Sequence, residues 1–243
     1  MKQIRNRILF LVITALALTN SSCTKFTNRI KGQGPVVKQT YDMPPISGLA
    51  LSIDANVIVT HGDSQTVMIE GQQNIINNIE KYVTAEGLWN IGYYHSVTSH
   101  AGVRVIITTP RMDYVRVSGS GNIETTNTFP DSANVYVGIS GSGNISMATN
   151  ANSLESEISG SGRITLYGTA WDHHINISGS GDVRAFGLNT RNTYVRISGS
   201  GNSEVDVEEY LNVTISGSGN VLYKGNPDIE ANISGSGTII NWN

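Results

Sequence analysis

Four carboxylates gather within a short stretch of the sequence and are the first candidates for catalysis: Glu204, Asp206, Glu208 and Glu209. Asp182 and Arg184 precede them by about 20 residues. Clustered carboxylates perform the acid and base steps of glycoside hydrolases and related carbohydrate-active enzymes. Glu204 and Asp206 alternate with valines, however, as residues do on the solvated face of a strand. We therefore expect no catalytic residue here, and a polysaccharide lyase or hydrolase is the alternative interpretation.

Metal binding is the next chemistry to consider, and the pattern argues against it. His173 and His174 are neighbours, so on a strand they would point to opposite sides and could not ligate one ion together. Glycine-rich calcium-binding repeats carry an aspartate in every turn. The corresponding positions here are Asn122, Asn144, Arg163, Asp182, Asn202, Asn220 and Thr238. We expect an asparagine ladder at these positions, and neither a metal ion nor a cofactor.

Aromatic and arginine side chains offer recognition chemistry. Tyr114, Tyr136 and Tyr194 occupy the same outward position before a repeated motif, and Arg116 and Arg196 lie beside two of them. Tyrosine and arginine on a flat strand face suit a glycan or a protein partner. Exposed tyrosine is also a good strand former, which explains the same pattern without a ligand. The column is also interrupted by Glu155, His174 and Asn212.

The N-terminus predicts a lipid anchor. Residues 1–23 contain a basic start, an apolar run from Ile8 to Leu18 and small residues before Cys23, which is the single cysteine. This order is typical of a secretory signal and is too short for a spanning helix. Cys23 stands where bacterial lipoprotein signals place the acylated cysteine, although Asn20 replaces the usual leucine. We expect residues 1–23 to be a lipoprotein signal peptide ending at the lipidated Cys23.

Residues 24–39 are predicted to be a flexible tether, because the stretch from 24 to 35 is polar, basic and contains glycine. The net charge of the chain is −3. Residues 111–243 carry seven basic and thirteen acidic side chains. Nucleic-acid binding needs cationic surface, so this balance argues against it.

A repeat organises the second half of the chain and positions all these side chains. Ser-Gly-Ser-Gly begins at residues 118, 140, 159, 178, 198, 216 and 234, in steps of 18 to 22 residues. Self-similarity at this period is typical of a solenoid, in which each turn is stabilised by its neighbours. Glycine reaches positive φ at a corner, and serine is small enough to stack on the next turn. Seven turns at strand spacing would form a rod of about 30 Å.

The residues on both sides of each motif alternate between apolar and polar, so each repeat reads as strand, corner, strand. The side chains expected inside are Val115, Val117, Ile123, Val137, Ile139, Ile145, Ile158, Ile164, Ile175, Ile177, Val183, Val195, Ile197, Val213, Ile215, Val221, Ile233 and Ile239.

Residues 40–110 lack the motif but read mostly as strands, with helical spacing of isoleucines over 74–82. A solenoid needs a covered end, so this segment is expected to form irregular first turns and a cap. The prediction is an all-β, right-handed parallel β-helix in one domain, residues 40–243, with 40–110 as the cap and 111–243 as the repeats.

The chain resembles a known family in the run from Ile46-Ser-Gly-Leu through Val57-Ile-Val, the Glu86-Gly-Leu88 turn, Val103–Pro110 and Val117-Ser-Gly-Ser-Gly-Asn-Ile123. These features, in this order, are similar to the auto-transporter adhesin "head GIN" domain of Bacteroidetes-type lipoproteins. The resemblance covers about residues 40–240. It implies a right-handed β-helix-like fold and a cell-envelope setting, and it supplies no catalytic or binding residue.

The sequence thus favours a non-enzymatic, outer-membrane lipoprotein, facing either the periplasm or the surface, that binds or supports through the face of a solenoid. Its expected partners are the membrane, through the N-terminal anchor, and a glycan or an envelope protein. A self-associating scaffold is a further alternative, because the last turn, 237–243, ends without an obvious cap unless Trp242 folds over it.

Overall fold

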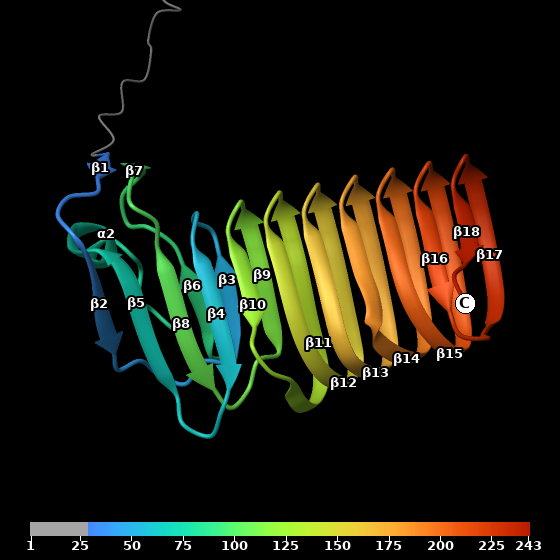
Figure 1. Ribbon diagram of the computed structural model, residues 1–243, viewed down its shortest axis with the longest axis horizontal. Coiled ribbons are helices and arrows are strands. Elements are labelled where there is room, and N and C mark those ends of the chain that lie inside the picture. Colours follow the sequence, from blue (N-terminus) through green and yellow to red (C-terminus); the bar gives the residue numbers. More distant parts are fainter. Residues whose placement is uncertain (1–28) are drawn as a thin grey trace, which may run out of the picture.

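The computed structural model describes residues 29–243 as a rod of strands laid side by side, from the blue N-terminal end to the red C-terminal end in Figure 1. The N-terminal part contains β1 (Ile30–Lys31), β2 (Val36–Tyr41), β3 (Gly48–Leu51), β4 (Asn56–His61), β5 (Thr66–Gln72), α2 (Gln73–Asn77), β6 (Leu88–Ile91), β7 (Val97–Ser99) and β8 (Arg104–Thr109). The repeats contain β9 (Tyr114–Gly119), β10 (Asn122–Thr125), β11 (Phe129–Gly141), β12 (Asn144–Gly160), β13 (Arg163–Gly179), β14 (Asp182–Gly199), β15 (Asn202–Gly217), β16 (Asn220–Lys224), β17 (Asp228–Gly235) and β18 (Thr238–Asn241).

Successive turns pair in parallel, and equivalent repeat positions lie next to one another. Ile158 is level with Ile177, which is level with Ile197 in the following turn. The predicted solenoid of roughly 19-residue turns is confirmed. The period arises because each turn returns the same apolar side chains to the same column, where they bury one another.

The two glycines of each motif have different physical roles at the corner, as one copy illustrates. Gly179 has a φ of +130°, a region that L-residues rarely adopt. Gly181 has ordinary φ, but a Cβ there would lie 2.6 Å from the carbonyl oxygen of Gly162 and 2.5 Å from Ile158 Cγ2. The first glycine therefore makes the bend, and the second allows neighbouring turns to approach.

The solenoid has two faces. We call the face formed by β2, β5, β8, β4, β10, β16, β18 and the first halves of β12–β15 the ladder face. The tyrosine face is formed by β6, β3, β9, β11, β17 and the second halves of β12–β15. Figure 1 shows the long ribbons of β12–β15 curving at the edge opposite the glycine corners, so that one strand contributes to both faces.

The N-terminal end is closed by irregular elements, as expected. Strand β5 runs antiparallel to both β8 and β2, which breaks the parallel stacking. Helix α2 follows β5 and buries Ile75 and Ile76. It is shorter than the stretch with helical spacing. The predicted tether, residues 24–39, also differs from the structure. Ile30–Lys31 pairs with β7 as strand β1, and Val36–Tyr41 pairs with β5 as strand β2.

The predicted core is buried except in the last turn. Ile233 is 41 % exposed and Ile239 is only partly buried, so the expectation that both lie inside is wrong. Both residues alternate inward like their equivalents, but no further turn among the described residues packs on β17 and β18. Trp242 does not cover this end either, since it is 56 % exposed.

No helix among residues 29–243 is long and apolar enough to cross a bilayer. The predicted signal peptide over 1–23 and the predicted lipidation of Cys23 both lie outside the described residues.

Candidate functional site

The tyrosine face carries the aromatic column that the sequence pattern predicts. Tyr114 is level with Tyr136 on the next turn, and their rings stack with centroids 4.9 Å apart. Glu155 and His174 follow in the same register, and Tyr194 comes next. The three tyrosines thus share a column, but Tyr194 is separated from the other two.

A hydrogen bond fixes the ring of Tyr136. Its hydroxyl donates to Oε2 of Glu157 at 2.6 Å. The ring reaches this carboxylate by lying over Gly138, where a Cβ would be 2.6 Å from the tyrosine oxygen. Burial, reinforced by the hydrogen bond, raises the pKa of Tyr136 above the ordinary tyrosine value. Arg116 is level with Gly138, so a cation, an aromatic ring and a carboxylate meet here.

A second aromatic group forms further along the same face. The ring of His174 stacks on Tyr194 at 4.7 Å, and Tyr210 meets Tyr194 edge-on at 5.9 Å. A hollow of about 240 Å³ lies beside this group, with Arg196 and Asn212 in its lining. The sequence pattern treats His174 as an interruption of the tyrosines. The structure instead makes it part of the stack, because a histidine ring matches the flat neighbour in the next turn.

The expected asparagine ladder is present on the ladder face. Asn122 donates from Nδ2 to Oδ1 of Asn56 at 2.9 Å, and Asn144 donates to Asn122 at 2.8 Å. Asn202 donates to Asp182 and Asn220 donates to Asn202 further along the row. Asn56, which precedes the first repeat, also belongs to the row, because β10 pairs with β4 at this level. The sequence pattern did not predict Asn56 as part of the row, because no Ser-Gly-Ser-Gly motif precedes it.

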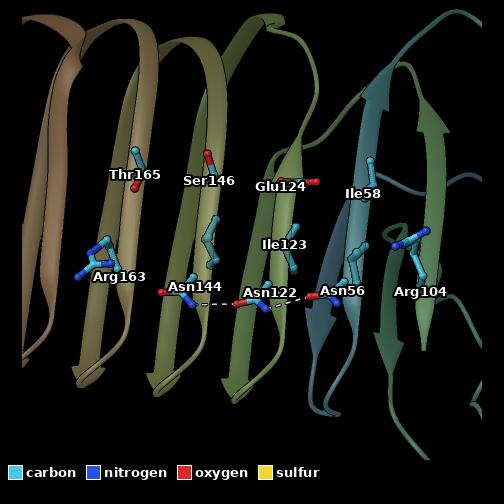
Figure 2. Close-up of a pocket in the computed structure, with 12 residues that line it drawn as sticks. Asn56, Ile58, Arg104, Asn122, Ile123, Glu124, Asn144, Ser146, Arg163 and Thr165 are labelled. Atoms are coloured by element: carbon cyan, nitrogen blue, oxygen red, sulfur yellow. Dashed lines mark hydrogen bonds between the residues drawn. The ribbon is translucent and has the colours of Figure 1, made fainter. Parts of the chain in front are cut away.

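A shallow groove with a volume of about 450 Å³ runs along this ladder. Figure 2 shows Arg104 at one end of its lining and Arg163 at the other. The groove opens where the neighbouring row holds the small side chains of Ser146 and Thr165. Arg104 pairs with Glu70 and Arg163 pairs with Asp182, each at 3.5 Å. These polar groups are therefore largely bonded to one another, and the groove is a weaker candidate for ligand binding than the tyrosine face.

The candidate catalytic carboxylates lie on outward positions. Glu209 pairs with Arg191, with 2.6 Å between Oε2 and Nε. Asp182 accepts from Asn202 and pairs with Arg163, so it belongs to the ladder. Glu204 is level with Arg184 on the preceding turn and helps to line a hollow of about 200 Å³. Glu208 is exposed.

The histidine pair is split between the two sides of its strand, as predicted. His173 is fully buried, and Nε2 lies 2.9 Å from the hydroxyl of Ser156. His174 is exposed on the tyrosine face. Within residues 29–243, no three His, Cys, Asp or Glu side chains gather where they could hold a metal ion.

Comparison with known proteins places these features in a family. The model of the family described as "putative auto-transporter adhesin, head GIN domain" matches residues 46–227. A search of curated protein sequences found no match.

Several solved structures share the fold. A putative adhesin from Bacteroides fragilis superposes with a TM-score of 0.78 at 22 % identity, covering 88 % of this chain and all of that one. A putative adhesin from Parabacteroides distasonis gives 0.72 at 21 % identity, again covering 88 % and 100 %. A protein from the same organism described as a putative lipid binding protein gives 0.71 at 20 % identity, covering 89 % and 100 %. At these identities the comparison establishes the fold alone.

Proposed function

Because the chain belongs to the head GIN domain family of putative auto-transporter adhesins, we propose that it is a non-enzymatic binding module of the cell envelope that holds a protein partner on its tyrosine face. The observation that carries this proposal is the aromatic column stacked from turn to turn on a continuous sheet. Family membership supports binding in general, and the column supports this face.

The geometry of the rings favours a protein over a glycan on this face. Tyr114 stacks on Tyr136 at an interplanar angle of 12°, and His174 stacks on Tyr194 at 8°. Rings stacked in this way cover one another's faces and turn their edges outward. Tyrosine and arginine on a flat surface are typical of protein interfaces, where a few such side chains carry most of the binding free energy.

The fixed position of Tyr136 supports the same proposal. Its ring is already ordered by Glu157, so a partner would not bear the entropic cost of ordering it. Arg116 and Arg196 would add charge-assisted hydrogen bonds to acidic or carbonyl groups of the partner.

Outward placement of the candidate acids supports a non-enzymatic role, with a carbohydrate-active enzyme as the alternative. A polysaccharide-cleavage assay distinguishes the two. Cleavage by the wild-type chain that is lost in both Glu204→Gln and Asp206→Asn would overturn the binding-module proposal.

The experiment that tests the tyrosine face combines crosslinking with direct binding. A photoreactive residue in place of Arg196 identifies the neighbouring envelope protein in cells, and the purified partner is then titrated against the purified full chain. We expect Tyr136→Ala and Tyr194→Ala each to weaken binding by about tenfold or more. Tyr82→Ala is the matched control, since Tyr82 is 69 % exposed in the N-terminal part. Equal binding by the wild-type chain and all three variants contradicts the proposal.

Self-association is a second candidate because the last described turn is uncovered. Every residue of β17 is exposed, and Ile229 and Ile233 present apolar surface beside unpaired strand edge. Sedimentation equilibrium tests this role. A concentration-dependent dimer that Ile229→Asp converts to monomer would support it, and a monomeric wild-type chain would exclude it.

A further inference from the structure

An exposed tryptophan marks a second site, away from the stacked rings of the tyrosine face. Trp171 lies on β13 at the edge opposite the glycine corners and is 54 % exposed. Tyr167, four residues earlier on the same bend, is 49 % exposed. A single exposed ring is common on protein surfaces, whereas two exposed aromatic side chains on one bend of the solenoid form a candidate recognition surface.

The indole of Trp171 is held in place from one side. The guanidinium of Arg191, which lies on the following strand β14, is 4.2 Å from the ring centroid. Arg191 is itself fixed by Glu209 on β15 at 2.6 Å. This chain of contacts orients the indole across three turns and covers the ring face toward β14. Arg191 occupies one face of the ring, and the neighbouring turn on the other side of Trp171 is β12.

On that side lies a polar hollow. The strand register places Asn152 level with Trp171, between the pairs Ala151–Ala170 and Ser153–Asp172. Asn152 lines a hollow of about 290 Å³ together with Asp131, Ser132, Asn150, Ala151 and Thr169. Asp131 is placed there by an irregularity of β11 and is the single non-glycine residue with positive φ (54°) among residues 29–243.

Hydrogen-bonding capacity remains free in this hollow. Asn150 uses its Oδ1 to accept from Thr169 at 3.1 Å, and its amide N–H groups make no hydrogen bond to a side chain among residues 29–243. Asn152 is exposed, as is Asp131. The hollow thus offers amide donors and acceptors and one carboxylate, and its lining includes no cation.

We propose that Trp171 and the hollow lined by Asp131, Asn150 and Asn152 form a binding subsite for a neutral pyranose unit of a glycan. A pyranose has an apolar C–H face that packs on an aromatic ring, and hydroxyls around its rim that match amide and carboxylate groups. A phosphate or uronate would meet the Asp131 carboxylate without a compensating cation. The tyrosine face and this subsite are separate, and the subsite does not depend on the proposed protein partner.

The subsite is tested with the purified full chain and a panel of neutral mono- and oligosaccharides, by saturation-transfer NMR and titration. We expect at least one sugar to bind saturably, with affinity reduced about tenfold or more by Trp171→Ala and by Asn152→Ala. Trp242→Ala is the matched control, because Trp242 is 56 % exposed at the far end of the rod, and it should leave the affinity unchanged.

The melting temperatures of all variants establish that each is folded. Tyr136→Ala distinguishes the two proposals, since it should weaken binding of the protein partner and leave sugar binding unchanged. The inference is wrong if no sugar of the panel binds at millimolar concentration, or if Trp171→Ala binds as tightly as Trp242→Ala.

Discussion

At the scale of the single residue, His173 is an ionisable side chain enclosed in the apolar core. It is fully buried and hydrogen-bonded to Ser156, and its Nδ1 has no hydrogen-bond partner within the described part of the chain. Burial, with a smaller contribution from His174, lowers the pKa of His173 to about 3. The imidazole is therefore neutral inside the core, and charging it would place an unpaired cation there.

This burial predicts acid sensitivity. An unfolded histidine has a pKa of about 6.5, so between roughly pH 6.5 and pH 3 the unfolded chain binds a proton that the folded chain refuses. The stability contributed by His173 is complete above about pH 6.5 and is lost progressively as pH falls toward 3. We expect the unfolding free energy, measured by urea titration, to decline over this interval.

The double variant Ser156→Ala/His173→Leu tests that expectation without leaving an orphaned hydroxyl. Leucine suits the position because Leu154 and Leu211 occupy the same column. The variant should lose most of the pH dependence over this interval, and an unchanged slope would show that other groups govern it.

The sequence predicts single residues unevenly. It places the tyrosines in one column and His173 opposite His174, because alternation along a strand is a local property. It does not reveal Trp171, whose role depends on Arg191 and Glu209 from two other turns. The hollow beside it is lined in part by Asp131, whose positive φ no motif encodes.

At the scale of the element, the two glycines of a corner are needed for different reasons: Gly179 for its positive φ, and Gly181 for its close contact with the neighbouring turn. A side chain at Gly181 would collide with the backbone of Gly162 and with Ile158, although its own φ is ordinary. The neighbours are backbone and a packed core side chain, so they cannot move cheaply.

We therefore expect Gly181→Ala to lower the unfolding free energy by about 2 kcal/mol or more, measured by denaturant titration. Ser180→Ala is the control from the same corner, because Ser180 is exposed. It should stay within about 0.5 kcal/mol of the wild type. Equal effects would mean that the turns are not packed as described.

The same substitution at equivalent strand positions should destabilise the protein by different amounts, depending on whether a further turn covers the position. Ile177 and Ile233 occupy the same column, but Ile177 is 2 % exposed and Ile233 is 41 % exposed. Ile177→Asp should destabilise by several kcal/mol through a buried charge, as read from the melting temperature and denaturant midpoint. Ile233→Asp should cost far less. A reversed order would contradict the burial pattern.

The strands and corners of residues 111–243 were predictable because the same pattern recurs in every repeat, so that the other copies resolve an ambiguous one. The cap was predictable for a different reason, since a solenoid needs a covered end. The exceptions lie where repetition stops. Ile233 keeps the apolar pattern but lacks a covering turn, and Val36–Tyr41 becomes a strand only because β5 offers a partner edge. Tertiary pairing decides both cases, and neither is visible in a local window.

At the scale of the whole molecule, the predicted lipid anchor at Cys23 would attach the rod to a membrane. Replacing Cys23 with Ala should release the protein from membranes or block its processing, as measured by fractionation and by the mass of the mature chain. A chain that is processed normally and stays membrane-bound would refute anchoring at Cys23. Surface proteolysis of intact cells then distinguishes a periplasmic from a surface-facing rod.

The parallel stacking of turns also has a mechanical consequence. Hydrogen bonds between turns run along the rod axis. A force that pulls the two ends apart therefore acts on the hydrogen bonds between each pair of neighbouring turns. Among the described residues, the turn formed by β17 and β18 has a neighbouring turn on one side only, so it should detach before the others. Each turn of roughly 19 residues would then release about 60 Å of slack. Together with the predicted anchor at Cys23, this arrangement predicts that the rod extends in equal steps, which would limit the force on a partner bound to it.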